Sequence, residues 1–71
     1  MKKKIELSGS GEMMKTLFEL SYPHIHICDT HKTNQLINRY ALEVENGMDS
    51  KKALDLLQDG IMANGLAGYD E

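Results

Sequence analysis

The sequence has no tryptophan, one proline, one phenylalanine and one cysteine among its 71 residues. A single cysteine, Cys28, cannot form a disulfide within the chain, which is typical of proteins in the reducing cytosol. The N-terminal lysines are not followed by the apolar stretch of a signal peptide, and no apolar run approaches the roughly 20 residues that span a bilayer. The sequence therefore predicts a cytoplasmic protein without a membrane segment.

The chain is also too short for more than one domain. It is 41% hydrophobic and 27% charged, a composition typical of globular proteins. A domain of this size buries only about 60% of its unfolded surface, so we expect a small core and no deep active site. We predict a single domain over residues 1–71, frayed at 1–3 and 66–71, that forms a homodimer because its own core is thin.

The first part of the chain predicts a strand followed by a helix. Ile5 and Leu7 alternate with polar residues, which predicts a short strand over 3–7. Ser10 is the expected N-cap of the helix, which should end before Pro23 because proline disfavours helical geometry in the residue before it. The expected apolar face of this helix comprises Met13, Met14, Leu17, Phe18 and Leu20.

The rest of the chain predicts a second strand and two helices. Residues 24–28 alternate between apolar and polar, as a short strand does. The next helix should end at Asn46-Gly47, and the last helix should start at Asp49 or Ser50 and end before Gly65. Their expected apolar faces comprise Leu36, Ile37, Tyr40, Ala41 and Val44, and Ala53, Leu54, Leu57 and Ile61. The predicted fold class is α+β in the order β-α-β-α-α, with the last two helices forming an antiparallel αα-hairpin.

Histidine and cysteine are concentrated within eight residues of the chain. On a strand, His24, His26 and Cys28 point to the same face. The Cα atoms of successive members are about 7 Å apart, a spacing that lets two side chains share a metal ion. Asp29 or His31 could complete a tetrahedral zinc shell. A zinc-binding module is therefore one hypothesis, and a plain solvent-facing strand is its alternative. A Cys–His nucleophile pair lacks an orienting residue and an identifiable oxyanion donor.

The net charge of −3 is unevenly distributed. Residues 1–40 carry six basic and four acidic side chains, whereas residues 41–71 carry two basic and seven acidic ones. This distribution predicts that the helical hairpin contacts a protein partner with a basic surface, together with the edge of the second strand. Solubility alone is the alternative explanation of the acidic half. The expected contact residues are Glu43, Glu45, Asp49, Asp55 and Asp59, with Met48 and Met62.

Part of the sequence resembles the pattern of a phosphate-binding loop, but one glycine of that pattern is missing. Gly9, Lys15 and Thr16 match the pattern Gly, four residues, Gly, Lys, Ser or Thr. Met14 stands where the second glycine must let the backbone wrap around phosphate, and the chain is too short for the parallel sheet of such enzymes. We therefore expect no nucleotide hydrolysis.

DNA binding is a weaker alternative. Lys51 and Lys52 open the last helix, but Asp55 and Asp59 follow them, so this helix would bind phosphates poorly. The sequence predicts a noncatalytic protein–protein interaction module without a cofactor. A chain of this size without a catalytic constellation suits a small accessory or regulatory protein, for example of a phage or mobile element.

Overall fold

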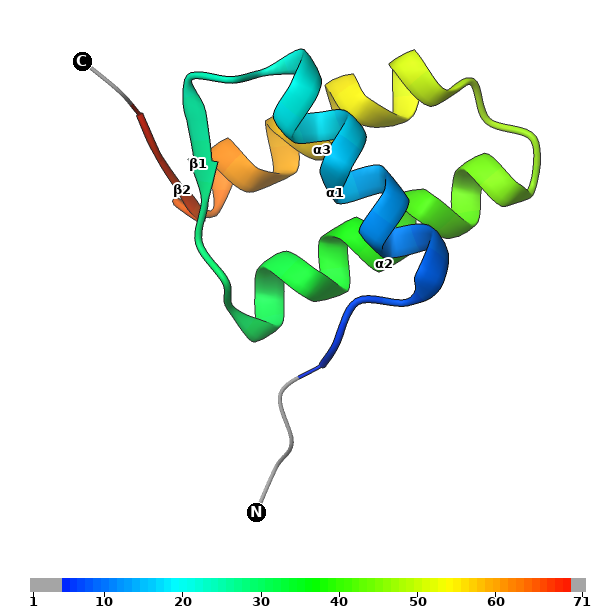
Figure 1. Ribbon diagram of the computed structural model, residues 1–71, viewed down its shortest axis with the longest axis horizontal. Helices are drawn as coiled ribbons and strands as arrows, with labels where there is room; N and C mark the ends of the chain where they lie inside the picture. The colour runs from blue at the N-terminus through cyan, green and yellow to red at the C-terminus, as the bar shows by residue number, and fades with distance from the viewer. Residues whose placement is uncertain (1–4, 70–71) are drawn as a thin grey trace.

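A computed structural model describes residues 5–69, which form three helices and a two-stranded antiparallel sheet (Figure 1). The elements are α1 (Gly9–Ser21), β1 (Ile25–Ile27), α2 (His31–Glu45), α3 (Ser50–Ala63) and β2 (Ala67–Tyr69). The predicted class, a small α+β fold, is confirmed. The order is α-β-α-α-β, which differs from the predicted β-α-β-α-α at both ends of the chain. The predicted fraying of residues 1–3 lies outside the described residues.

The predicted strand over 3–7 is wrong in its described part, because residues 5–8 form no strand. This N-terminal segment lies along α2, where asparagine side chains pair with its backbone. Asn34 Nδ2 donates to the Ile5 carbonyl at 2.8 Å, and Asn38 Nδ2 donates to the Glu6 carbonyl at 2.8 Å. Asn38 Oδ1 accepts from the Ser8 N–H at 2.9 Å. A polar face of α2 therefore satisfies backbone groups that a neighbouring strand would otherwise satisfy.

Each helix begins at a side chain that caps its free N–H groups. Ser8, Thr30 and Asp49 each accept a hydrogen bond from the backbone N–H three residues later. The prediction of Ser10 as the first cap is wrong, because α1 already begins at Gly9. The predicted start of the last helix at Asp49 or Ser50 is confirmed, since α3 begins at Ser50 with Asp49 as its cap. Caps of this kind stabilise a helix by about 1 kcal/mol each.

The sheet joins the middle of the chain to its C-terminal part. β1 and β2 are antiparallel, with Ile25 opposite Tyr69 and Ile27 opposite Ala67. Leu66, just before β2, is only 8% exposed. The sequence predicts a frayed tail from residue 66 onward, whereas the structure places Leu66 against the core and Ala67–Tyr69 in the sheet. Residues 70 and 71 lie outside the described part of the chain.

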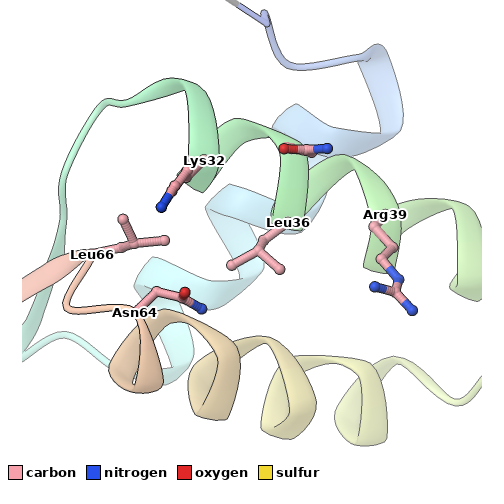
Figure 2. Close-up of a pocket in the computed structure, with 6 residues that line it drawn as sticks. Lys32, Leu36, Arg39, Asn64 and Leu66 are labelled. Carbon is pink, nitrogen blue, oxygen red and sulfur yellow. The ribbon is translucent and has the colours of Figure 1, made fainter.

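The two longer helices are connected by a short turn over residues 46–49 and pack against each other. Gly47 in this turn has a φ of 113°, a conformation that side-chain-bearing residues rarely adopt, so the predicted glycine stop is confirmed. Lys32, Leu36 and Arg39 project from α2 towards α3 and leave a pocket between the two helices (Figure 2).

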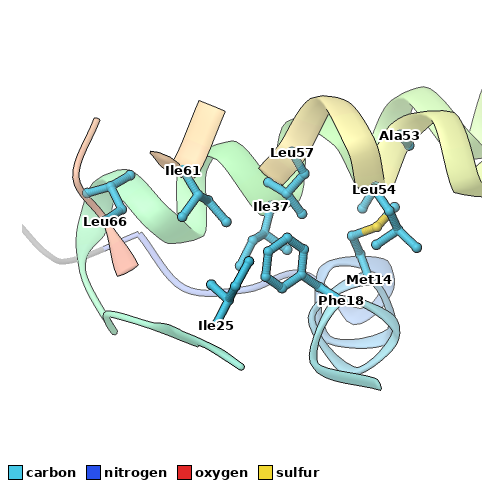
Figure 3. Packing of buried hydrophobic residues seen from close by; sticks show 10 residues of the cluster. Met14, Phe18, Ile25, Ile37, Ala53, Leu54, Leu57, Ile61 and Leu66 are labelled. Atoms are coloured by element: carbon cyan, nitrogen blue, oxygen red, sulfur yellow. The ribbon is translucent and has the colours of Figure 1, made fainter. Parts of the chain in front are cut away.

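All three helices contribute to one small core. Phe18 from α1, Ile37 from α2 and Leu57 from α3 have no exposed surface and point towards one another (Figure 3). The other buried apolar residues are Met14, Ile25, Ala41, Ala53, Leu54, Ile61 and Leu66. The predicted faces of α2 and α3 are thus confirmed, with Leu36, Tyr40 and Val44 half-buried at the border of the core.

Candidate interaction surface

The exposed side of α1 carries three large apolar side chains that we call the α1 stripe. Met13 is 69% exposed, Leu17 42% and Leu20 74%. Their spacing of four and three residues places them on one face of the helix. The sequence predicts all three as core, but only Met14 and Phe18 of the predicted face are buried. The stripe is therefore apolar surface that the fold does not cover.

Two adjoining hollows run beside the stripe, between α1 and the C-terminal end of α2 and the N-terminal end of α3. The first has a volume of about 220 Å³ and the second about 350 Å³. They share Leu17 and Ser50 and therefore adjoin one another, and we call the two hollows together the α1 groove. Met13 and Val44 line the first hollow, and Leu54 lines the second. An apolar groove beside an exposed apolar helix face is typical of a protein contact surface.

The α1 groove carries opposite charges at its two ends. Glu45 lines the hollow at the Ser10 end of α1, and Lys51 lines the hollow at the Tyr22 end. No other charged residue lines either hollow in the described chain. This distribution gives the groove a direction, from negative to positive along α1.

The predicted acidic contact residues do not form a single surface. Asp49 caps α3 and accepts from the Lys52 N–H at 3.2 Å. Glu43 and Glu45 are two positions apart on α2 and therefore point to different sides of the helix. Asp55 is one turn before Asp59 on the exposed face of α3.

The two methionines predicted as contact residues have different environments. Met48 is half-buried and packs against the core, whereas Met62 is 48% exposed. Met62 follows Asp55 by seven residues on α3, so both occupy the same outer face as Asp59. This outer α3 face is the part of the predicted surface that the structure brings together.

Asp55 also has an intramolecular partner. The Tyr22 hydroxyl donates to Asp55 Oδ1 at 2.7 Å, and the Tyr22 ring packs on Phe18 with ring centroids 4.9 Å apart. The hydrogen bond to Asp55 raises the pKa of Tyr22 above its ordinary value, with smaller contributions from desolvation and the charges of Asp55 and Asp59. The contact connects α3 to the C-terminal end of α1.

The histidines and the cysteine predicted as a metal site are spread along the surface. His24 lies in the turn before β1, His26 within β1 and Cys28 just after it, and all three are exposed. His31 begins α2, where its Nδ1 accepts a hydrogen bond from the Ile5 N–H at 3.3 Å. Between residues 5 and 69, no three histidine, cysteine, aspartate or glutamate side chains are placed to hold a metal ion. The geometry therefore gives the zinc hypothesis no support.

Comparison with known proteins returned no match: no family model fits the chain, and no curated protein and no solved structure is significantly similar to it. Among the helices of the described residues, none is long and apolar enough to cross a membrane.

Sequence reasoning treats the residues of the α1 stripe as core. One signal in the sequence could have separated them from the buried residues. Met13, Met14, Leu17, Phe18 and Leu20 span an arc wider than one neighbouring helix can cover. An apolar arc of that width leaves part of itself for a second contact.

Proposed function

We propose that this chain is a noncatalytic interaction protein that assembles through the α1 stripe and the α1 groove. The observation that carries the proposal is the alignment of Met13, Leu17 and Leu20, which are 42–74% exposed beside an apolar groove. Covering apolar surface stabilises an association by about 25 cal/mol per Å². The proposed role needs no catalytic group.

The proposed occupant of the groove is a second copy of the chain. A two-fold axis near Leu17 would place α1 antiparallel to α1 of the second copy, so that Met13 meets Leu20 of that copy. The same axis brings Glu45 of each copy to the Lys51 end of the other groove. Two-fold interfaces require such self-complementary surfaces. The opposite charges at the groove ends support this arrangement.

The size of the chain supports assembly as well. A standard interface buries about 800 Å² on each partner. The chain exposes 5001 Å² in all, so one face of it can supply that area. The outer α3 face, with Asp55, Asp59 and Met62, lies outside the residues of the groove. We keep that face as the proposed contact for a partner with a basic surface.

Sedimentation analysis at micromolar concentration tests the proposed assembly. We expect the wild type to sediment as a dimer and Leu17→Arg to sediment as a monomer, because the two-fold axis would bring two arginines together. Leu42→Arg is the matched control, because Leu42 is 54% exposed and lines neither hollow. Circular dichroism would show that each variant keeps its helices.

A charge swap tests the orientation of the two copies. Glu45→Lys alone and Lys51→Glu alone should each weaken the dimer, because each places like charges opposite one another. The double variant restores both pairs and should recover the dimer. The new charges suit their positions, since lysine favours a helix C-terminus and glutamate an N-terminus. A monomeric wild type, or a double variant as weak as the single ones, would contradict the proposal.

A further inference from the structure

A second pocket lies on the other side of α2, between α2 and the C-terminal end of α3. Its volume is about 230 Å³, and it is lined by Lys32, Gln35, Leu36, Arg39, Asn64 and Leu66 (Figure 2). None of these residues lines the α1 groove. A ligand here would therefore be independent of the proposed assembly.

The pocket is cationic although the chain as a whole is acidic. Its charged lining consists of Lys32 and Arg39, and no carboxylate lines it in the described chain. Within residues 5–69, neither side chain forms an ion pair or a hydrogen bond, so both cations are available to a ligand. Gln35 adds a neutral amide to the wall.

The two cations are separated by an apolar surface. Lys32 and Arg39 are seven residues apart on α2, which corresponds to about two helical turns or roughly 10 Å. Leu36 lies between them on the same side of the helix, and Leu66 is only 8% exposed. In Figure 2, Lys32, Leu36 and Arg39 all project from α2 towards α3. The pocket thus presents a cation, an apolar patch and a second cation in order.

We infer that this pocket binds a short linear dicarboxylate whose apolar middle lies on Leu36 and Leu66. One carboxylate pairs with the Lys32 ammonium and the other with the Arg39 guanidinium, which suits planar carboxylates. The hydrocarbon between them covers the leucines. A single anion satisfies one cation only, and a dianion with a polar middle places hydroxyl groups against leucine side chains.

Nuclear magnetic resonance titration of the full chain with adipate tests the inference. We expect saturable chemical-shift changes of the backbone amides near Lys32, Leu36, Arg39 and Leu66. The affinity for adipate should fall as salt is added, because salt screens the charge pairs. Valerate, with one carboxylate, and galactarate, with hydroxyl groups along the same length, should bind about fivefold more weakly or worse. Inorganic phosphate is a further probe that lacks the apolar middle and should also bind more weakly.

Substitutions inside and outside the pocket test whether adipate binds at this site. Lys32→Gln and Arg39→Gln should each weaken adipate binding about fivefold, and the double variant further. Lys52→Gln removes a comparable exposed cation from α3 outside the pocket and should leave binding unchanged. The amide spectrum of each variant shows whether it is folded. The inference fails if adipate gives no saturable shifts, if valerate, galactarate or phosphate binds equally well, or if Lys52→Gln weakens binding as much as Lys32→Gln.

Discussion

Gly11 and Asn38 are packed so closely that a Cβ atom on Gly11 would overlap Asn38 Oδ1. The same oxygen accepts a hydrogen bond from the Ser8 N–H, so it cannot move without breaking that bond. Gly11 is buried within α1, and its φ is not in the left-handed region. The requirement for glycine here is therefore close approach of α1 to α2 rather than backbone conformation.

Gly11→Ala should therefore destabilise the fold, although alanine normally favours a helix. We expect a cost of about 1–3 kcal/mol, measured by urea unfolding, because the Cβ atom overpacks the contact. Gly9→Ala is the matched control, since no atom lies within 4 Å of a Cβ placed there, and it should be neutral or slightly stabilising. In an Asn38→Ala background the cost of Gly11→Ala should fall. An equal cost in both backgrounds would show that Asn38 is not the obstacle.

The Tyr22–Asp55 hydrogen bond predicts a loss of stability at alkaline pH. The pKa of Tyr22 is raised from 10.0 by this bond, so the folded-state pKa is higher than the unfolded one. The stabilisation is therefore complete below the unfolded-state pKa and is lost as the pH rises through the folded-state pKa. Ultraviolet titration of the phenolate should show a lower pKa for Tyr22 in Asp55→Ala, whereas Asp59→Asn should have a smaller effect. Identical titrations in wild type and Asp55→Ala would rule out this contact in solution.

Substitution of the buried Leu57 tests how much the small core contributes to stability. Leu57→Ala should cost about 2–5 kcal/mol, because the side chain has no exposed surface and its removal leaves a cavity. Leu42→Ala removes the same atoms from a side chain that is 54% exposed and should cost far less. Thermal unfolding followed by circular dichroism compares the two. Similar melting temperatures for the two variants would mean that α3 does not bury Leu57.

Removing the C-terminal strand β2 should lower the stability of the fold. A chain cut after Leu66 loses β2 and should be less stable by about 1–3 kcal/mol, since each ladder hydrogen bond is worth about 1 kcal/mol. A chain cut after Tyr69 keeps β2 and is the matched control. Urea unfolding of the two shortened chains measures the difference. If both chains have the same midpoint, the β1–β2 pairing contributes nothing to stability.

The sequence predicts the three helices well because their periodicity, caps and glycine stops are local signals. It fails at the two ends of the chain, where the structure depends on distant partners. Ile5 and Leu7 alternate as a strand would, but the partner of this segment is a pair of asparagine side chains on α2. Ala67–Tyr69 has too few residues to show alternation, and it becomes a strand because β1 lies beside it.

The candidate surface is predictable only in part, for a similar reason. Hydrophobic spacing identifies Met13, Leu17 and Leu20 as one side of a helix but does not state how many neighbours that helix has. α1 packs mainly against α2, so its apolar arc is only half covered. The charge pattern likewise identifies acidic residues but not that Asp49 and Asp55 already have intramolecular partners.

The β1–β2 pairing has a consequence for synthesis on the ribosome. Ile27 and Ala67 lie opposite one another, yet all of α2 and α3 is translated between them. Until β2 has been translated, β1 has no partner strand in the described fold, and Ile25 lacks its contact with the strand opposite it. Contacts between positions so far apart in sequence form late, because the loop between them must close first. The sheet can therefore close only after both α2 and α3 have been translated.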